Sequence, residues 1–218
     1  MALFPAVRSP SNRNLGGLVR MGVAFASRMS RRPRLGCLFE IVETLVLTLI
    51  IFLVIQNFVA QPYKVEQGSM EHTLEPDQYV LVDKLTPRFD SYRRGDVVVF
   101  APPPGYERAG GAPFIKRVIG VGGDTVDVRD GEVYVNGTLL AEPYLFADAV
   151  GDPPEPTVAS RESWTVPAGH LFVLGDHRAV SEDSRTFGTV PISSVIGRAW
   201  LRYWPINVFG VLPTPRYP

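Results

Sequence analysis

The stretch PFIKRVIGVGGDTVDVRDGEVYVNG, residues 113–137, predicts short strands separated by tight turns. Its apolar residues fall in three short, β-branched runs, which lie at 113–121, 125–128 and 132–135. Two dipeptides between and after these runs, Asp130-Gly131 and Asn136-Gly137, are strong hairpin signals because these residue types accept positive φ angles. The stretch therefore favours a fold that is mainly β.

The same pattern continues on both sides of this stretch. Short apolar runs bounded by turn residues also occur at 79–84, 96–101, 170–174 and 197–204. Residues 146–162 are acidic and rich in proline, which is typical of an exposed loop, and no long amphipathic helix is expected after residue 63. We therefore expect one mainly β domain over residues 61–218.

The composition fits one domain of ordinary size. The chain has 218 residues, of which 45% are hydrophobic and 20% charged, so it is not a disordered polymer. A single cysteine excludes an intrachain disulfide and any zinc site built from several cysteines.

An uncharged run of 20 residues, 44–63, precedes the β-rich part. A helix over 38–60 rises about 1.5 Å per residue and is long enough for the roughly 30 Å hydrocarbon core of a bilayer. The main alternative is a cleaved signal peptide, but the run is too long for one. It also places the bulky Phe58 where cleavage needs a small residue. We therefore expect a transmembrane helix at 38–60 that stays attached.

The charges on either side of this run are unequal. Residues 1–37 contain seven arginines and no acidic residue, whereas residues 61–218 contain 15 basic and 20 acidic residues. Cationic flanks are retained on the cytoplasmic side of a membrane. We therefore predict a cytoplasmic basic tail at 1–37 and an extracytoplasmic domain at 61–218.

Several kinds of catalytic or binding site are not supported by the sequence. The only histidines are His72, His170 and His177, and each lies in a loop-like position where we expect an exposed side chain. There is no paired-histidine metal spacing, and no nucleotide-binding pattern is complete. We expect no cofactor, no metal and no nucleic-acid partner.

Lysine is the informative residue type, because the 22 basic residues include only Lys64, Lys84 and Lys116. A desolvated lysine can lose its proton near neutral pH, whereas arginine cannot. By strand alternation, Lys116 shares one face with Phe114 and Val118. The pattern leaves open whether that face is covered by protein or solvated. A serine that could partner this lysine lies in the segment Gln67-Gly68-Ser69-Met70, although such a segment alone is usually a turn.

Four segments together carry a resemblance to a known family. They are QGSMEHTL at 67–74, RGDVVVF at 94–100, KRVIGVGGD at 116–124 and GDHRAVSEDSRTFG at 175–188. In this order, behind a single membrane anchor, they resemble the motifs of the bacterial type I signal peptidases (leader peptidases). These are membrane-anchored Ser/Lys endopeptidases.

The resemblance implies roles for five residues. Ser69 matches the nucleophile and Lys116 the general base. Ser181 matches the serine that hydrogen-bonds the lysine amine and orients it, and Asp183 and Arg185 match an ion pair that supports the site. The resemblance also implies a β-rich catalytic domain with a smaller inserted β subdomain and loop at about 127–170.

The expected substrate is a secretory preprotein, cut after a small-x-small sequence on the outer face of the bacterial plasma (inner) membrane. An extended substrate would add as a strand beside residues 65–68 and 113–116. Four apolar side chains are expected to wall its shallow pockets, namely Val65, Met70, Leu74 and Ile115.

Departures from the family pattern affect loops rather than the proposed dyad. Gln67 stands where many relatives have a serine that donates to the oxyanion, so its amide is the candidate donor here. His72 and Gly122 replace motif prolines, and His177 replaces an asparagine. These departures leave loop geometry open but not the class of enzyme.

Two alternatives belong to other functional classes. A self-cleaving Ser/Lys repressor would carry a DNA-binding helix-turn-helix at its N-terminus, where this chain has an apolar run. A non-catalytic, membrane-tethered β module would not need Ser69, Lys116 and Ser181 together. A preprotein-cleavage assay distinguishes the enzyme from both alternatives.

Overall fold

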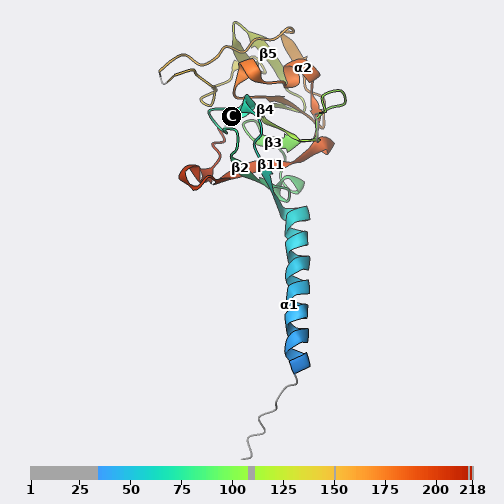
Figure 1. Ribbon diagram of the computed structural model, residues 1–218. Coiled ribbons are helices and arrows are strands. Elements are labelled where there is room, and N and C mark those ends of the chain that lie inside the picture. The colour runs from blue at the N-terminus through green and yellow to red at the C-terminus, as the bar shows by residue number, and fades with distance from the viewer. Residues whose placement is uncertain (1–33, 108–110, 150, 216, 218) are drawn as a thin grey trace, which may run out of the picture. The chain divides into compact units, whose positions relative to one another are not determined.

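The computed structural model describes residues 34–107, 111–149, 151–215 and 217, and its N-terminal element is a long apolar helix (Figure 1). This helix, α1, covers Arg34–Val54 and continues into a π-helical turn, η1, at Ile55–Val59. The segment Gly36–Val59 has 24 residues and a mean hydropathy of 2.6, and none of its most apolar window is buried. By length and composition this segment can cross a membrane.

The helix predicted for residues 38–60 is found with shifted ends. It begins at Arg34, and Ala60 belongs instead to the first strand, β1 (Ala60–Lys64). The other six arginines of the predicted basic tail lie outside the described residues. The boundary between the chain's two compact units, Met1–Thr44 and Leu45–Pro218, falls within α1, and all strands named below belong to the second unit.

The larger of two sheets has eight strands, all paired antiparallel in the order β1-β2-β11-β3-β4-β9-β10, with β12 added to β11 (Figure 1). β11 lies between β2 and β3, although β2 and β3 are neighbours in the sequence. Besides β1, the strands are β2 (Tyr79–Asp83), β3 (Val97–Phe100), β4 (Phe114–Val121), β9 (His170–Leu174), β10 (Val190–Pro191), β11 (Val195–Trp204) and β12 (Gly210–Val211).

The smaller sheet has four strands in the order β7-β6-β5-β8 and covers residues 125–165, which overlap the inserted subdomain expected at about 127–170. Its turns have the predicted geometry, since Asp130, Gly131, Asn136 and Gly137 all have positive φ angles between 52° and 81°. The strands are β5 (Thr125–Arg129), β6 (Glu132–Val135), β7 (Thr138–Leu139) and β8 (Ser163–Thr165).

Helices are short in the described residues that follow β1. The longest, α2 (Ser184–Phe187), has four residues. The others are 3₁₀ turns: η2 (Gly68–Met70), η3 (Thr86–Arg88), η4 (Arg178–Val180), η5 (Ile192–Ser194) and η6 (Ile206–Val208). The predicted class, a mainly β protein with one N-terminal apolar helix, is confirmed.

Two central strands, β3 and β4, make the frame of the core. Every residue of β3 is buried, and so are six of the eight residues of β4. In β4 the buried residues lie on both faces, so both faces are covered, and β3 and β9 pair with its two edges. A side chain on this strand is therefore held in a dry and rigid surrounding.

Candidate active site

Ser69 and Lys116 meet in the structure, although 47 residues separate them. The Lys116 Nζ donates a hydrogen bond to the Ser69 Oγ at 2.6 Å. Ser69 lies in the 3₁₀ turn η2, and Lys116 lies in β4 opposite Val98 of β3. The side-chain atoms of a candidate nucleophile and a candidate base are thus within direct proton-transfer distance.

The surroundings of Lys116 show whether its face of β4 is covered by protein or solvated, which the strand pattern left open. The residue is only 1% exposed, so its face of β4 is covered rather than solvated. The ring of Phe114, two residues earlier on the same face, lies 5.5 Å from the Nζ. Burial of an amine among apolar groups favours its neutral form, which is the form that can accept a proton.

A buried network of charged and polar side chains ties three of the sequence motifs together. The Arg117 guanidinium donates to both carboxylate oxygens of Asp176, at 2.8 and 2.6 Å. The Thr73 hydroxyl donates to Asp176 at 2.6 Å and accepts from Arg117 at 3.1 Å. Arg117 and Asp176 are fully buried, so this network fixes the turn after Ser69 against the strand that carries Lys116.

The electrostatics of this network favour the charged form of its arginine. Burial lowers the pKa of Arg117, but the hydrogen bonds and charge of Asp176 more than offset that effect, so the pKa is raised above its ordinary value. Sequence reasoning did not assign roles to Thr73, Arg117 and Asp176. The available signal was a pair of opposite charges in two of the motifs: Arg117 lies in the apolar segment 116–124, and Asp176 lies in the segment 175–188.

The predicted ion pair between Asp183 and Arg185 is present in the structure. Arg185 donates to both Asp183 oxygens at 2.8 Å, and Asp183 also accepts from the backbone N–H of Gly175 at 3.1 Å. Arg185 donates further to the carbonyl of Arg178 at 2.7 Å. The pair therefore fixes the loop between β9 and α2.

Ser181 lies close to the turn that carries Ser69, but its expected contact is not formed. Its Oγ is buried and has no hydrogen-bond partner among the described residues, so the predicted hydrogen bond to the Lys116 amine is absent. A Cβ added to Gly175 would come within 2.2 Å of the Ser181 Oγ and 2.5 Å of the Ser69 carbonyl oxygen. Only glycine at position 175 permits this close approach of the two segments.

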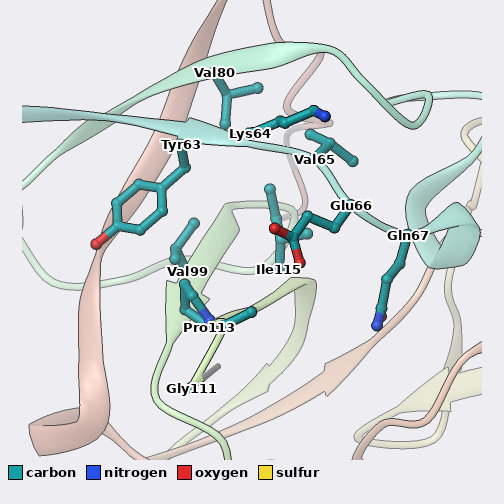
Figure 2. Close-up of a pocket in the computed structure, with 11 residues that line it drawn as sticks. Tyr63, Lys64, Val65, Glu66, Gln67, Val80, Val99, Gly111, Pro113 and Ile115 are labelled. Atoms are coloured by element: carbon teal, nitrogen blue, oxygen red, sulfur yellow. The ribbon is translucent and has the colours of Figure 1, made fainter. Parts of the chain in front are cut away.

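A cleft of about 280 Å³ lies between two segments, 63–67 and 111–115, which come directly before Ser69 and Lys116 in the sequence (Figure 2). Val65 and Ile115 line it as predicted, and Gln67 lines it at the end nearest Ser69 in the sequence. The backbone of Gln67 is extended, with φ −135° and ψ 151°. The cleft therefore has the form of a slot beside an open strand.

Two of the four predicted pocket residues do not face this cleft. Met70 and Leu74 are completely buried and pack with Val80, Val82 and Val97 in the core. The turn η2 directs Met70 into the core, and neither Met70 nor Leu74 is among the residues that line the cleft. Their assignment to the pocket was wrong.

The replacement of the motif proline by His72 changes the backbone. His72 has a φ of 81°, in the left-handed region, whereas the proline ring restricts φ to about −65°. The turn after Ser69 therefore has a conformation in this chain that proline at position 72 could not adopt.

Comparison with known proteins identifies the family of this chain. The family model described as "Signal peptidase, peptidase S26" matches residues 38–204. Signal peptidase I of Leptolyngbya laminosa is 39% identical over 184 residues, covering 83% of this chain and 87% of that protein. Signal peptidase IB of Staphylococcus aureus is 32% identical over 185 residues, covering 79% of this chain and 92% of that protein.

A crystal structure of a signal peptidase I from Enterococcus faecalis is also similar. It shares 35% sequence identity and covers 50% of this chain and 97% of that one, with a TM-score of 0.38. The family match spans the apolar helix, the serine turn, β4 and β11. The family match and the two curated relatives show that the chain belongs to the S26 family of signal peptidases.

Proposed function

We propose that Ser69 is the nucleophile and Lys116 the general base of a serine endopeptidase. As a member of its family, the protein removes signal peptides from secreted preproteins. The 2.6 Å contact between the Lys116 Nζ and the Ser69 Oγ, in a buried setting, is the observation that carries the assignment. A non-catalytic tethering module has no use for such a pair.

The reaction follows from the position of the pair. A neutral Lys116 amine accepts the Ser69 hydroxyl proton while the Oγ attacks the scissile carbonyl. The tetrahedral intermediate then collapses to a serine ester, and the protonated amine gives its proton to the leaving amino group. Lys116 next takes a proton from a water that attacks the ester, which releases the signal peptide and restores the hydroxyl.

The negative oxygen of the tetrahedral intermediate needs hydrogen-bond donors. We assign one to the Ser69 backbone N–H and a second to the side-chain amide of Gln67, a residue that lines the cleft between 63–67 and 111–115. We assign Ser181 the role of orienting the Lys116 amine. Its hydroxyl is buried and would accept a hydrogen bond from Lys116 once the amine has taken a proton. Asp183 and Arg185 hold the loop that presents Ser181.

The substrate would bind as an added strand in the cleft. The extended segments on its two sides offer backbone N–H and C=O groups, and alternate substrate side chains would point inward. Val65 and Ile115 line this slot, which supports a preference for small residues before the cut, as in a small-x-small sequence.

The membrane arrangement is part of the same proposal. We assign residues 38–60 to a span of the bacterial plasma membrane, residues 1–37 to the cytoplasm and residues 61–218 to the outer side. Protease added to intact spheroplasts should degrade the 61–218 portion and leave a short protected N-terminal fragment. Full protection of the 61–218 portion would contradict this topology.

The assignment of Ser69 is tested with the full chain reconstituted in lipid and a preprotein carrying a small-x-small site. Ser69→Ala should yield no mature product, and mass spectrometry should locate the wild-type cut directly after the small-x-small residues. Ser193→Ala, at an exposed serine, is the matched control and should cleave at the wild-type rate. Wild-type cleavage by Ser69→Ala would refute the mechanism.

The contribution of Gln67 should be smaller. Gln67→Ala should lower kcat about tenfold, or about 1.4 kcal/mol, with little change in KM, because an oxyanion donor acts mainly in the transition state. A long side chain is poorly preorganised, and the Ser69 N–H remains. Steady-state kinetics measure this effect, and a loss of several hundredfold would show that Gln67 is the principal donor.

A further inference from the structure

His177 is enclosed by three side chains, contrary to the exposed position expected from its loop-like sequence. Its Nδ1 lies 2.7 Å from the Glu71 Oε2, and its Nε2 lies 3.4 Å from the Glu155 Oε1. Its ring stacks on that of Phe146, with 4.0 Å between the centroids and 16° between the planes. The side chain is only 12% exposed. We name these four residues the His177 latch.

One end of the latch holds the turn that carries the nucleophile. The His177 backbone N–H donates to the Ser69 carbonyl at 3.2 Å. Glu71 lies two residues after Ser69, and its own N–H donates to the Gly68 carbonyl at 2.9 Å. The backbone and the ring of His177 therefore contact the same short turn at two points, the Ser69 carbonyl and the Glu71 carboxylate.

The other end of the latch lies in the acidic, proline-rich loop at residues 146–162. Phe146 and Glu155 come from this loop and are joined by a hydrogen bond from the Glu155 N–H to the Phe146 carbonyl at 2.9 Å. The Phe146 N–H donates to the Asp176 carbonyl, and the Glu155 carboxylate accepts from the Ala179 N–H, both at 3.1 Å. The loop is thus fixed around the imidazole ring.

We propose that His177 is a positioning residue that couples the acidic loop to the Ser69 nucleophile. Its ring lies between the carboxylates of Glu71 and Glu155 and is hydrogen-bonded to Glu71. Removal of the ring leaves two neighbouring carboxylates that repel each other and frees the loop from the Ser69 turn. A displacement of about 1 Å at a reacting atom can cost on the order of 100-fold in rate.

This coupling rests on the proposed role of Ser69, and it assigns a function to a departure from the family pattern. An asparagine at position 177, as in that pattern, can donate from its amide to Glu71. It cannot also reach Glu155 or present a flat imidazole face to Phe146. His177→Asn should therefore restore one of the three side-chain contacts.

The test measures kcat and KM for preprotein cleavage by the full chain in lipid. His177→Ala should lower kcat roughly 30- to 100-fold while KM and the thermal unfolding midpoint stay near wild type. His177→Asn should recover to within about tenfold of wild type. Glu71→Gln keeps an acceptor for the ring and should cost less than tenfold. Asp152→Asn, at an exposed acid in the same loop, should have no effect.

A double-mutant cycle separates positioning from general damage. Glu71→Ala combined with His177→Ala should cost little more than His177→Ala alone, because both changes remove the same contact. Wild-type kcat in His177→Ala, or additive losses in the double variant, would overturn the proposal. Ser69→Ala in the same assay distinguishes failure of the His177 proposal from failure of the Ser69 assignment. Activity of Ser69→Ala would contradict the assignment of Ser69 as the nucleophile.

Discussion

Lys116→Arg should abolish preprotein cleavage, with a loss on the order of 10⁴- to 10⁶-fold, although it preserves the positive charge and nearly the length of the side chain. Arginine keeps its proton at every working pH, so it cannot accept one from Ser69. Lys116→Ala should be equally inactive. Cleavage kinetics with the full chain in lipid measure both variants.

The double variant Ser69→Ala/Lys116→Ala should be no less active than either single variant, because the two residues act as a unit. Lys84→Arg is the matched control, since Lys84 is only partly buried and lies apart from the pair, with its Nζ 3.2 Å from the Gln61 Oε1. It should retain the wild-type rate. Substantial cleavage by Lys116→Arg would remove Lys116 from the role of base.

Asp176→Ala should cause the largest loss of stability, about 3–5 kcal/mol, because it leaves the fully buried Arg117 without its carboxylate. The same change removes the acceptor of the Thr73 hydroxyl, so the turn after Ser69 should loosen as well. Denaturant unfolding of the full chain in detergent, followed by tryptophan fluorescence, measures the effect.

A surface pair supplies the control for this prediction. Asp127 lies 3.8 Å from Arg129, whose side chain is 51% exposed, and Asp127→Ala should change stability by no more than about 0.5 kcal/mol. The paired change Arg117→Met with Asp176→Leu should recover most of the loss, because no unpaired charge remains buried. Equal losses in the free energy of unfolding for Asp176→Ala and Asp127→Ala would show that the Arg117–Asp176 network does not stabilise the fold.

Local sequence patterns predicted the parts of the fold that depend on local chemistry. The hairpins at Asp130-Gly131 and Asn136-Gly137 depend on residues that accept positive φ, and both were predicted. The strands β6 and β9 begin and end at the predicted residues. The two-residue strands β7, β10 and β12 were missed, because so short a segment becomes a strand only through its partner.

The candidate site shows the same division. The motifs predicted that Ser69 and Lys116 would meet, but strand alternation alone could not say whether Lys116 was covered, since its cover depends on segments distant in the sequence, such as the turn η2 that carries Ser69. Met70 was misplaced because its direction depends on the 3₁₀ turn. His177 was misplaced because its three partners come from positions 71, 146 and 155.

The position of β11 has a consequence for how the protein is made. This strand, Val195–Trp204, fills the gap between β2 and β3, so residues 79–100 cannot complete their sheet until residues 195–204 have been made. Pairing between strands that are more than 100 residues apart in the sequence is slow, because closing the long loop costs entropy before any stabilising contact forms. During synthesis the frame that holds Lys116 therefore stays open at its centre. The frame around Lys116 is therefore complete only after the segment 195–204 has emerged.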